Sequence, residues 1–191
     1  MSNEISKAQD IVSAGMIANR TGAESVGAGG VFTVTCTAPD GTVKWVDTFH
    51  NLVVNQGLQD MNSKYFTGSG YSAAWYLGLV TGPGAGNTYA AGNTLATHAG
   101  WTENANYTGS RKAVTFGTAT TADPSVITNS AAPSAFVMNA NAQTIAGAFL
   151  CSVASGTSGV LFSVGNFTGG DKIVDSGDQL NVTYTFSLDA V

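Results

Sequence analysis

The side chains that most often perform chemistry in proteins are few in this chain. Its two histidines are His50 and His98. Neither has another histidine or a cysteine at the short sequence spacing that is typical of metal ligands. Ser69 has a glycine on each side, but the segment around it lacks the strand–turn–helix pattern of a nucleophile elbow. No glycine-rich segment ends in Gly-Lys-Ser or Gly-Lys-Thr, as a phosphate-cradling loop requires. We therefore expect neither enzymatic activity nor a bound cofactor.

Three aspartates near the C-terminal end form the best candidate for a metal site. Asp171, Asp175 and Asp178 fall in the predicted loop 169–179, where their carboxylates could gather around a calcium ion. Their spacing matches no twelve-residue calcium loop. Because aspartates between strands commonly stabilise turns, we prefer a role in turns and predict no metal site.

Aromatic residues form the best candidate for a carbohydrate site. Trp75, Tyr76, Trp101 and Tyr107 could line a glycan groove, or they could pack in the core or in a subunit interface. Glu103 is the one acid between Trp101 and Tyr107, whereas sugar hydrolysis needs two acids held across a cleft. The sequence therefore favours packing over a catalytic cleft.

Two cysteines and the first residues bear on the compartment. Cys36 and Cys151 each fall in a strand-like apolar run, where a lone cysteine usually behaves as a small hydrophobic side chain. A disulfide between them is the alternative, which a reducing cytosol would oppose. Residues 1–10 lack the pattern of a secretion signal, and no stretch approaches the roughly 18 apolar residues of a membrane span. We expect the protein to be made in, and to stay in, the cytoplasm and to have no membrane partner.

Charged side chains are scarce. Seven Lys and Arg against twelve Asp and Glu give a net charge of −5, so there is no basic surface for nucleic acid. Charged residues make up only 10% of the chain, which is too few for a helical bundle. A surface with so few charges is poorly protected against association, as in a subunit of an assembly, although low charge also accompanies β structure in general.

The elements that must position these residues are predicted to be β-strands. Apolar and polar residues alternate over 31–37, the turn Pro39-Asp40-Gly41 follows, and a second strand continues over 45–49. The clearest strand covers 180–188, with apolar residues at every second position. Further strands are predicted at 73–80, 111–116, 126–129, 135–139, 143–152 and 159–164. Without an internal repeat, these strands predict an all-β antiparallel β-sandwich of jelly-roll-like or Greek-key type.

One short helix is expected among the strands. Leu58, Met61 and Tyr65 recur at spacings of three and four, which predicts a helix over 57–66 with Asn55 as its N-cap. Segment 81–100 is rich in glycine and has few large side chains, so we predict a long exposed loop that contacts partners.

The chain is predicted to divide into an N-terminal arm, 1–30, and a β-sandwich domain, 31–191. If extended at about 3.3 Å per residue, thirty residues reach roughly 100 Å, enough to cross onto a neighbouring subunit. A short helix over 4–16 and a disordered tail are the alternatives. The residues expected to contact a partner or another subunit are Ile5, Ile11, Val12, Met16, Ile17, Pro83, Tyr89 and Trp101.

Several segments, in their order and spacing, resemble a group of tailed-bacteriophage virion proteins. They are TFHNLVVNQGLQDM (48–61), AAWYLGLV (73–80), THAGWTE (97–103), RKAVTF (111–116) and TIAGAFL (144–150). The resemblance spans most of residues 31–188 and implies a small β-sandwich structural subunit without enzymatic activity. It carries over no functional residues.

Within that group, our leading hypothesis is a head decoration (cement) protein. Such a subunit would sit on the outside of the virion as a trimer and bind the major capsid protein. The alternative is a tail component or a receptor- or glycan-binding tail protein.

Overall fold

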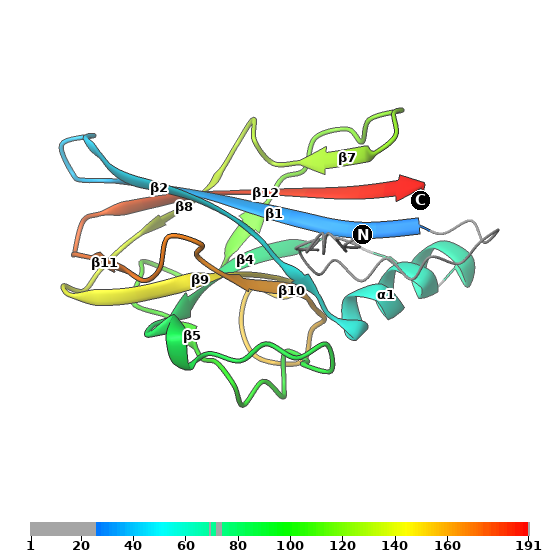
Figure 1. The fold of residues 1–191 in the computed structure, drawn as a ribbon, viewed down its shortest axis with the longest axis horizontal. Helices are drawn as coiled ribbons and strands as arrows, with labels where there is room; N and C mark the ends of the chain where they lie inside the picture. Colours follow the sequence, from blue (N-terminus) through cyan, green and yellow to red (C-terminus); the bar gives the residue numbers. More distant parts are fainter. Residues whose placement is uncertain (1–25, 69, 72–73, 191) are drawn as a thin grey trace, which may run out of the picture.

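The computed structural model of the chain describes residues 26–68, 70–71 and 74–190 (Figure 1). These residues form two antiparallel β-sheets and one α-helix, so the predicted all-β sandwich is confirmed. The five-stranded sheet contains β1 (Val26–Thr37), β2 (Val43–His50), β7 (Ser125–Thr128), β8 (Ser134–Val137) and β12 (Gln179–Ala190). The seven-stranded sheet contains β3 (Leu52–Val53), β4 (Trp75–Thr81), β5 (Glu103–Asn104), β6 (Lys112–Val114), β9 (Gln143–Cys151), β10 (Leu161–Asn166) and β11 (Lys172–Val174).

The two longest strands form the centre of the five-stranded sheet. β1 and β12 pair along their whole length, from Val26 opposite Ala190 to Thr37 opposite Gln179. The predicted hairpin of β1 and β2 is present, and Gly41 has a φ of 85°, which glycine adopts without strain. Because β1 begins at Val26, residues 26–30 belong to the sandwich and not to the predicted arm.

One side chain bridges a gap in the pairing of β12. β8 pairs with β12 up to Val182 and β7 pairs with it from Thr185, which leaves the edge of β12 that faces away from β1 without a strand partner between them. The fully buried Asn129 takes that place: its Nδ2 donates to the Val182 carbonyl at 3.2 Å, and its Oδ1 accepts from the Tyr184 amide at 2.7 Å. The amide side chain thus satisfies buried backbone groups that would otherwise lack partners.

The predicted helix is present as α1 (Asn55–Phe66), but the predicted cap is wrong. Val54 is the N-cap, with no side-chain hydrogen bond, and Asn55 is already inside the helix. The Asn55 amide instead donates to the Ala91 carbonyl at 2.8 Å. A neighbouring loop therefore satisfies one of the free donors at the helix start.

The core has two parts on opposite faces of the seven-stranded sheet. The larger part lies between the two sheets and includes Phe32, Phe49 and Tyr184. The smaller part lies on the outer face of the seven-stranded sheet and includes Leu95 and Trp101. Since β9 is buried on both faces, most of its side chains are excluded from solvent. Cys36 belongs to the larger part and Cys151 to the smaller, and both are free thiols, so the disulfide alternative is wrong.

The segment after β4 corrects a second prediction. It contains the short 3₁₀ helix η1 (Gly84–Gly86) and otherwise no regular structure, as expected for a loop. It is not simply exposed, because its Leu95 is buried and Tyr89 packs against the smaller part of the core. The loop covers the outer face of the seven-stranded sheet. No helix among the described residues is long and apolar enough to cross a bilayer.

Candidate functional site

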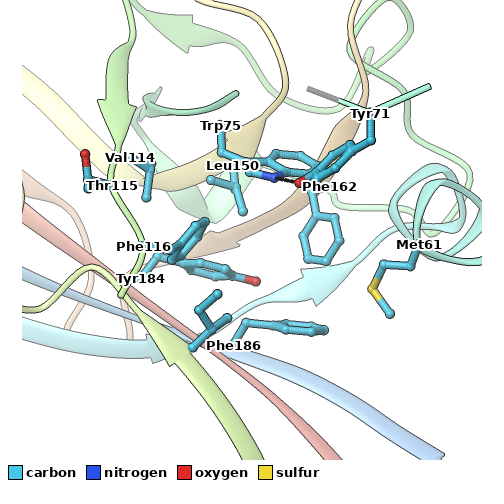
Figure 2. A pocket seen from close by; sticks show the side chains of 11 residues that line it. Met61, Tyr71, Trp75, Val114, Thr115, Phe116, Leu150, Phe162, Tyr184 and Phe186 are labelled. Atoms are coloured by element: carbon cyan, nitrogen blue, oxygen red, sulfur yellow. Dashed lines mark hydrogen bonds between the residues drawn. The ribbon is translucent and has the colours of Figure 1, made fainter. Parts of the chain in front are cut away.

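An open apolar groove lies between α1, the start of β4, the segment 114–127 and the second half of β12 (Figure 2). Its inner part has a volume of about 520 Å³ and its outer part about 690 Å³. The residues that line both parts are Met61, Tyr71, Trp75, Ile127 and Phe186. Volumes of this size are typical of sites that bind a small molecule, and several amino-acid side chains would fill the same space.

Aromatic rings build the inner part of the groove. Phe162 from β10 contacts Trp75 from β4 with ring centroids 5.3 Å apart, and it contacts Phe186 from β12 at the same centroid distance. Both contacts are edge-to-face, the arrangement that aromatic rings prefer. The indole Nε1 of Trp75 donates to the Tyr71 hydroxyl at 2.9 Å, as Figure 2 shows. These contacts fix the shape of the floor.

A buried polar group at the inner part is the Tyr184 hydroxyl. Asn51 Nδ2 lies 3.0 Å from it and Ser163 Oγ lies 3.3 Å from it, and both donate hydrogen bonds to it. Burial raises the pKa of Tyr184 to about 12. The hydroxyl therefore stays protonated at neutral pH and is already engaged within the sandwich, so it offers little to a polar ligand.

The outer part of the groove is rimmed by large apolar side chains that face solvent. The exposed fractions are 74% for Val26, 83% for Tyr65, 77% for Phe66 and 55% for Tyr71. Single exposed apolar residues are ordinary, but a contiguous set marks a site that contacts another molecule. The rim is therefore the strongest candidate contact surface in the part of the chain that the structure describes.

Charged groups are few at the groove. Of the described lining residues, Asp60 is the one carboxylate and Lys64 the one amine, and both lie at the outer part. Lys64 Nζ donates to the Gly70 carbonyl at 2.9 Å. The lining thus suits apolar binding and holds no second acid beside Asp60 that could form a catalytic pair with it.

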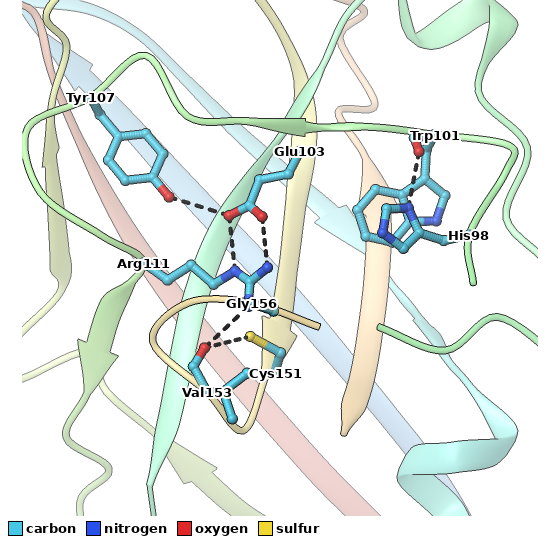
Figure 3. Close-up of polar contacts among 8 residues, drawn as sticks. All are labelled: His98, Trp101, Glu103, Tyr107, Arg111, Cys151, Val153 and Gly156. Atoms are coloured by element: carbon cyan, nitrogen blue, oxygen red, sulfur yellow. Dashed lines mark hydrogen bonds and ion pairs between the residues drawn. The ribbon is translucent and has the colours of Figure 1, made fainter. Parts of the chain in front are cut away.

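A second cluster lies on the seven-stranded sheet around Glu103 and Arg111 (Figure 3). The Arg111 guanidinium donates two hydrogen bonds to the Glu103 carboxylate, from Nε at 2.9 Å and from Nη2 at 2.7 Å. Its Nη1 donates to the carbonyls of Val153 at 3.2 Å and Gly156 at 3.0 Å. Burial, followed by the charge of Glu103, raises the pKa of the neighbouring Tyr107. Because these groups hydrogen-bond to one another, the cluster acts as a clamp: it links Glu103 and Arg111 to the loop that contains Val153 and Gly156.

The structure agrees with the packing interpretation for two aromatic residues, but one of them was also expected to contact a partner. Trp101 and Tyr107 are each only 3% exposed, so they pack in the core, as the packing interpretation predicts, and do not line a glycan groove. The Trp101 ring stacks on His98 with centroids 4.0 Å apart (Figure 3). Trp101 is therefore not available as a contact residue. Trp75 lines the apolar groove, and Tyr76 packs against the smaller part of the core.

The other expected contact residues have different positions. Pro83 is exposed, whereas Tyr89 is half-buried and its hydroxyl donates to Asn166 Oδ1. Burial raises the pKa of Tyr89 to about 12. Outside the described residues lie Ser69 and the five expected contacts of the arm, Ile5, Ile11, Val12, Met16 and Ile17.

The three aspartates of the metal hypothesis bind turns instead. Asp171 Oδ1 accepts from the Gly84 amide at 2.8 Å, and Asp175 Oδ1 accepts from the Ala142 amide at 2.9 Å. Asp178 Oδ2 accepts from the Asp175 amide at 2.9 Å and from Lys44 Nζ at 2.5 Å. The described residues contain no group of three His, Cys, Asp or Glu side chains arranged to hold a metal ion.

Sequence reasoning missed the groove. Its lining comes from segments that are distant in the chain, such as Met61, Ile127 and Phe186. The sequence contains one local signal of the groove. Tyr65, Phe66 and Tyr71 lie close together in the chain, and one face of a short helix with its connection cannot bury all three rings.

Comparisons with protein-family models, with curated proteins and with solved structures found no match for this chain. The fold and the site therefore define only the structural class of the protein. That class is an all-β sandwich with an open apolar groove beside its single described α-helix.

Proposed function

We propose that the protein is a structural subunit of a tailed-bacteriophage particle that decorates the outside of the head. In this role it binds the major capsid protein and stabilises the particle by bridging capsid subunits. The observation that carries the proposal is the exposed apolar rim of the groove, formed by Val26, Tyr65, Phe66 and Tyr71. Monomeric proteins rarely expose such a contiguous surface unless it contacts another macromolecule.

The segments that resemble virion proteins support this proposal because they form the frame of the groove. Segment 48–61 runs from the end of β2 into α1, and segment 73–80 contains most of β4. Segment 144–150 lies in β9, at the centre of the seven-stranded sheet. The resemblance therefore concerns the core of the sandwich and the elements beside the groove.

Binding through several separate surfaces is the proposed mechanism. The groove rim, the exposed Pro83 and the apolar residues of the N-terminal segment are the candidate surfaces. Simultaneous binding at linked sites raises the overall affinity by about two to four orders of magnitude over that of one site. A homotrimer would multiply the contacts further, since each copy presents the same surfaces.

Heat stability of particles with and without the protein tests the proposal. Particles assembled without it should release their DNA at a lower temperature, and added purified protein should restore the wild-type temperature. The variant Tyr65→Ser/Phe66→Ser should restore it poorly. Ile173→Ser is a matched control, because Ile173 is also an exposed apolar residue (65%) but lies on β11, outside the groove lining. Equal heat stability with and without the protein would refute the proposal.

A tail component, or a receptor- or glycan-binding tail protein, is the second candidate. The exposed rings of Tyr65 and Tyr71 favour it, because aromatic side chains with one apolar face and one polar end are common at binding surfaces. In that case the protein should bind host-surface glycans, and the Tyr65→Ser/Phe66→Ser variant should lose that binding.

A further inference from the structure

We propose that the groove is occupied by the chain's own N-terminal segment, with Ile11, Val12, Met16 and Ile17 in contact with its lining. The occupant is the segment of the same molecule. The inference describes the free protein, in which no capsid competes for the groove or for the segment, so it can be tested separately from the proposed role in a phage particle.

The N-terminal segment joins the sandwich beside the groove. Val26 is the first described residue, and its side chain lines the outer part of the groove. Residues 1–25 therefore connect to the sandwich at the mouth of the groove. The eight residues 18–25 separate Ile17 from Val26 and can span roughly 26 Å at about 3.3 Å per residue, which reaches the groove without strain.

The N-terminal segment and the groove lining are chemically complementary. The run Ile-Val-Ser-Ala-Gly-Met-Ile-Ala-Asn at 11–19 has no charged residue, and the groove lining is mostly apolar and aromatic. Asp10 and Arg20 flank this run, and the outer part of the groove carries one charge of each sign, Lys64 and Asp60. An uncharged run can thus lie in the groove while its flanking charges stay near groups of opposite sign at the rim.

The covalent link to the sandwich raises the local concentration of the segment at the groove. A short link gives the segment a local concentration in the millimolar range at the groove, about that expected for flexible linkers. A second copy or a separate apolar partner must compete with that local concentration. The geometry therefore favours the chain's own segment over that of a neighbour.

Paramagnetic broadening in the full-length protein tests the proposal. A nitroxide spin label is attached at Ser13→Cys; Cys36 and Cys151 are fully buried and should not react with the label. In uniformly ¹⁵N-labelled protein, the amide signals of Met61 and Ile127 should be lost, and that of Gly41 at the far hairpin turn should remain. Dilution by about tenfold should not change this pattern, because tethered binding does not depend on protein concentration. Unchanged signals at Met61 and Ile127 would overturn the proposal.

Matched variants separate specific docking from accidental proximity. Val12→Asp/Met16→Asp places two charges in the apolar run and should restore the lost signals. Ser6→Asp/Gln9→Asp adds the same charge at polar positions outside the run 11–19 and should leave the signals lost. If both variants behave alike, contact through the apolar run is refuted.

A mixed sample tests which molecule supplies the segment. It combines ¹⁵N-labelled protein without the spin label and unlabelled protein that carries it. Docking within one molecule predicts that the groove signals of the mixed sample stay intact. Loss of these signals would assign the occupant to a second copy and overturn the proposal.

Discussion

The rings of Phe162 and Phe186 meet edge-to-face at the floor of the groove, with centroids 5.3 Å apart and planes at 79°. Phe162 belongs to β10 of the seven-stranded sheet and Phe186 to β12 of the five-stranded sheet. Their contact therefore joins the two sheets at the place where the groove opens. The stability of the sandwich and the shape of the groove depend on the same pair.

Replacing Phe162 with alanine should lower the free energy of unfolding by about 3 kcal/mol, because the side chain is buried and leaves a cavity. The control is Phe66→Ala, where the side chain is mostly exposed, and here the loss should stay below about 0.5 kcal/mol. Urea unfolding followed by tryptophan fluorescence measures both values. Similar losses in the two variants would show that Phe162 does not join the sheets as described.

Replacing Glu103 with glutamine should lower the free energy of unfolding by about 2 kcal/mol. The substitution leaves the buried Arg111 guanidinium without the carboxylate that now accepts two of its hydrogen bonds. Asp189→Asn removes one negative charge at an exposed position and should have almost no effect. The same urea titration compares the variants, and an unchanged midpoint for Glu103→Gln would contradict the role of the cluster as a clamp.

Two adjacent glycines in β1 should respond differently to alanine. A Cβ atom at Gly30 would collide with the Tyr184 hydroxyl and lie 2.7 Å from Asn51 Oδ1, whereas the nearest atom to a Cβ at Gly29 is Ser187 Oγ at 3.9 Å. Gly30→Ala should therefore destabilise the protein by about 1–3 kcal/mol, as overpacking does. Gly29→Ala should be neutral or slightly stabilising. Thermal unfolding of the two variants tests this, and a Gly30→Ala protein as stable as Gly29→Ala would be inconsistent with the packing.

Stability should fall at alkaline pH, in part through Cys36. Burial raises the pKa of this thiol to about 11, whereas a thiol in the unfolded chain ionises near about 8.5. Between these values the unfolded chain holds fewer protons, so the free energy of unfolding decreases as pH rises. The contribution is complete below about pH 8.5 and is lost as pH rises through 11.

The Cys36→Ala variant isolates this contribution from that of the buried tyrosines. Between about pH 7.5 and pH 10.5 it should lose less stability than the wild type, because the ionising thiol is absent. Urea midpoints at the two pH values provide the comparison. An equal loss in both proteins would mean that Cys36 does not contribute.

Local sequence patterns predicted the strands and turns whose conformation is determined by their own residues. The β1–β2 hairpin follows from alternation together with a turn containing Gly41, and β12 follows from alternation alone. Three of the four shortest strands, β3, β5 and β11, are too short for any period to show and were not predicted. The start of β1 was also missed, because its glycines resemble a linker, although Gly30 is required where the Tyr184 hydroxyl approaches the backbone.

Features that depend on distant contacts could not be predicted. The predicted N-cap at Asn55 is wrong. The backbone amide of Asn55 donates to the carbonyl of Ala91, which lies in a loop, so no side-chain cap is needed for this donor at the helix start. Trp101 was expected to contact a partner, since nothing near it in sequence shows that the loop folds back over the seven-stranded sheet. The groove likewise requires segments around Met61, Ile127 and Phe186 to meet, and only the fold brings them together.

The most direct test of the proposed function is the copy number of this protein in purified phage particles, measured by quantitative mass spectrometry against the major capsid protein. Decoration of a symmetric shell places the subunit at every equivalent position, so the account predicts a ratio of about one to one. A ratio below about one in ten would contradict decoration and assign the protein to the tail or to a vertex.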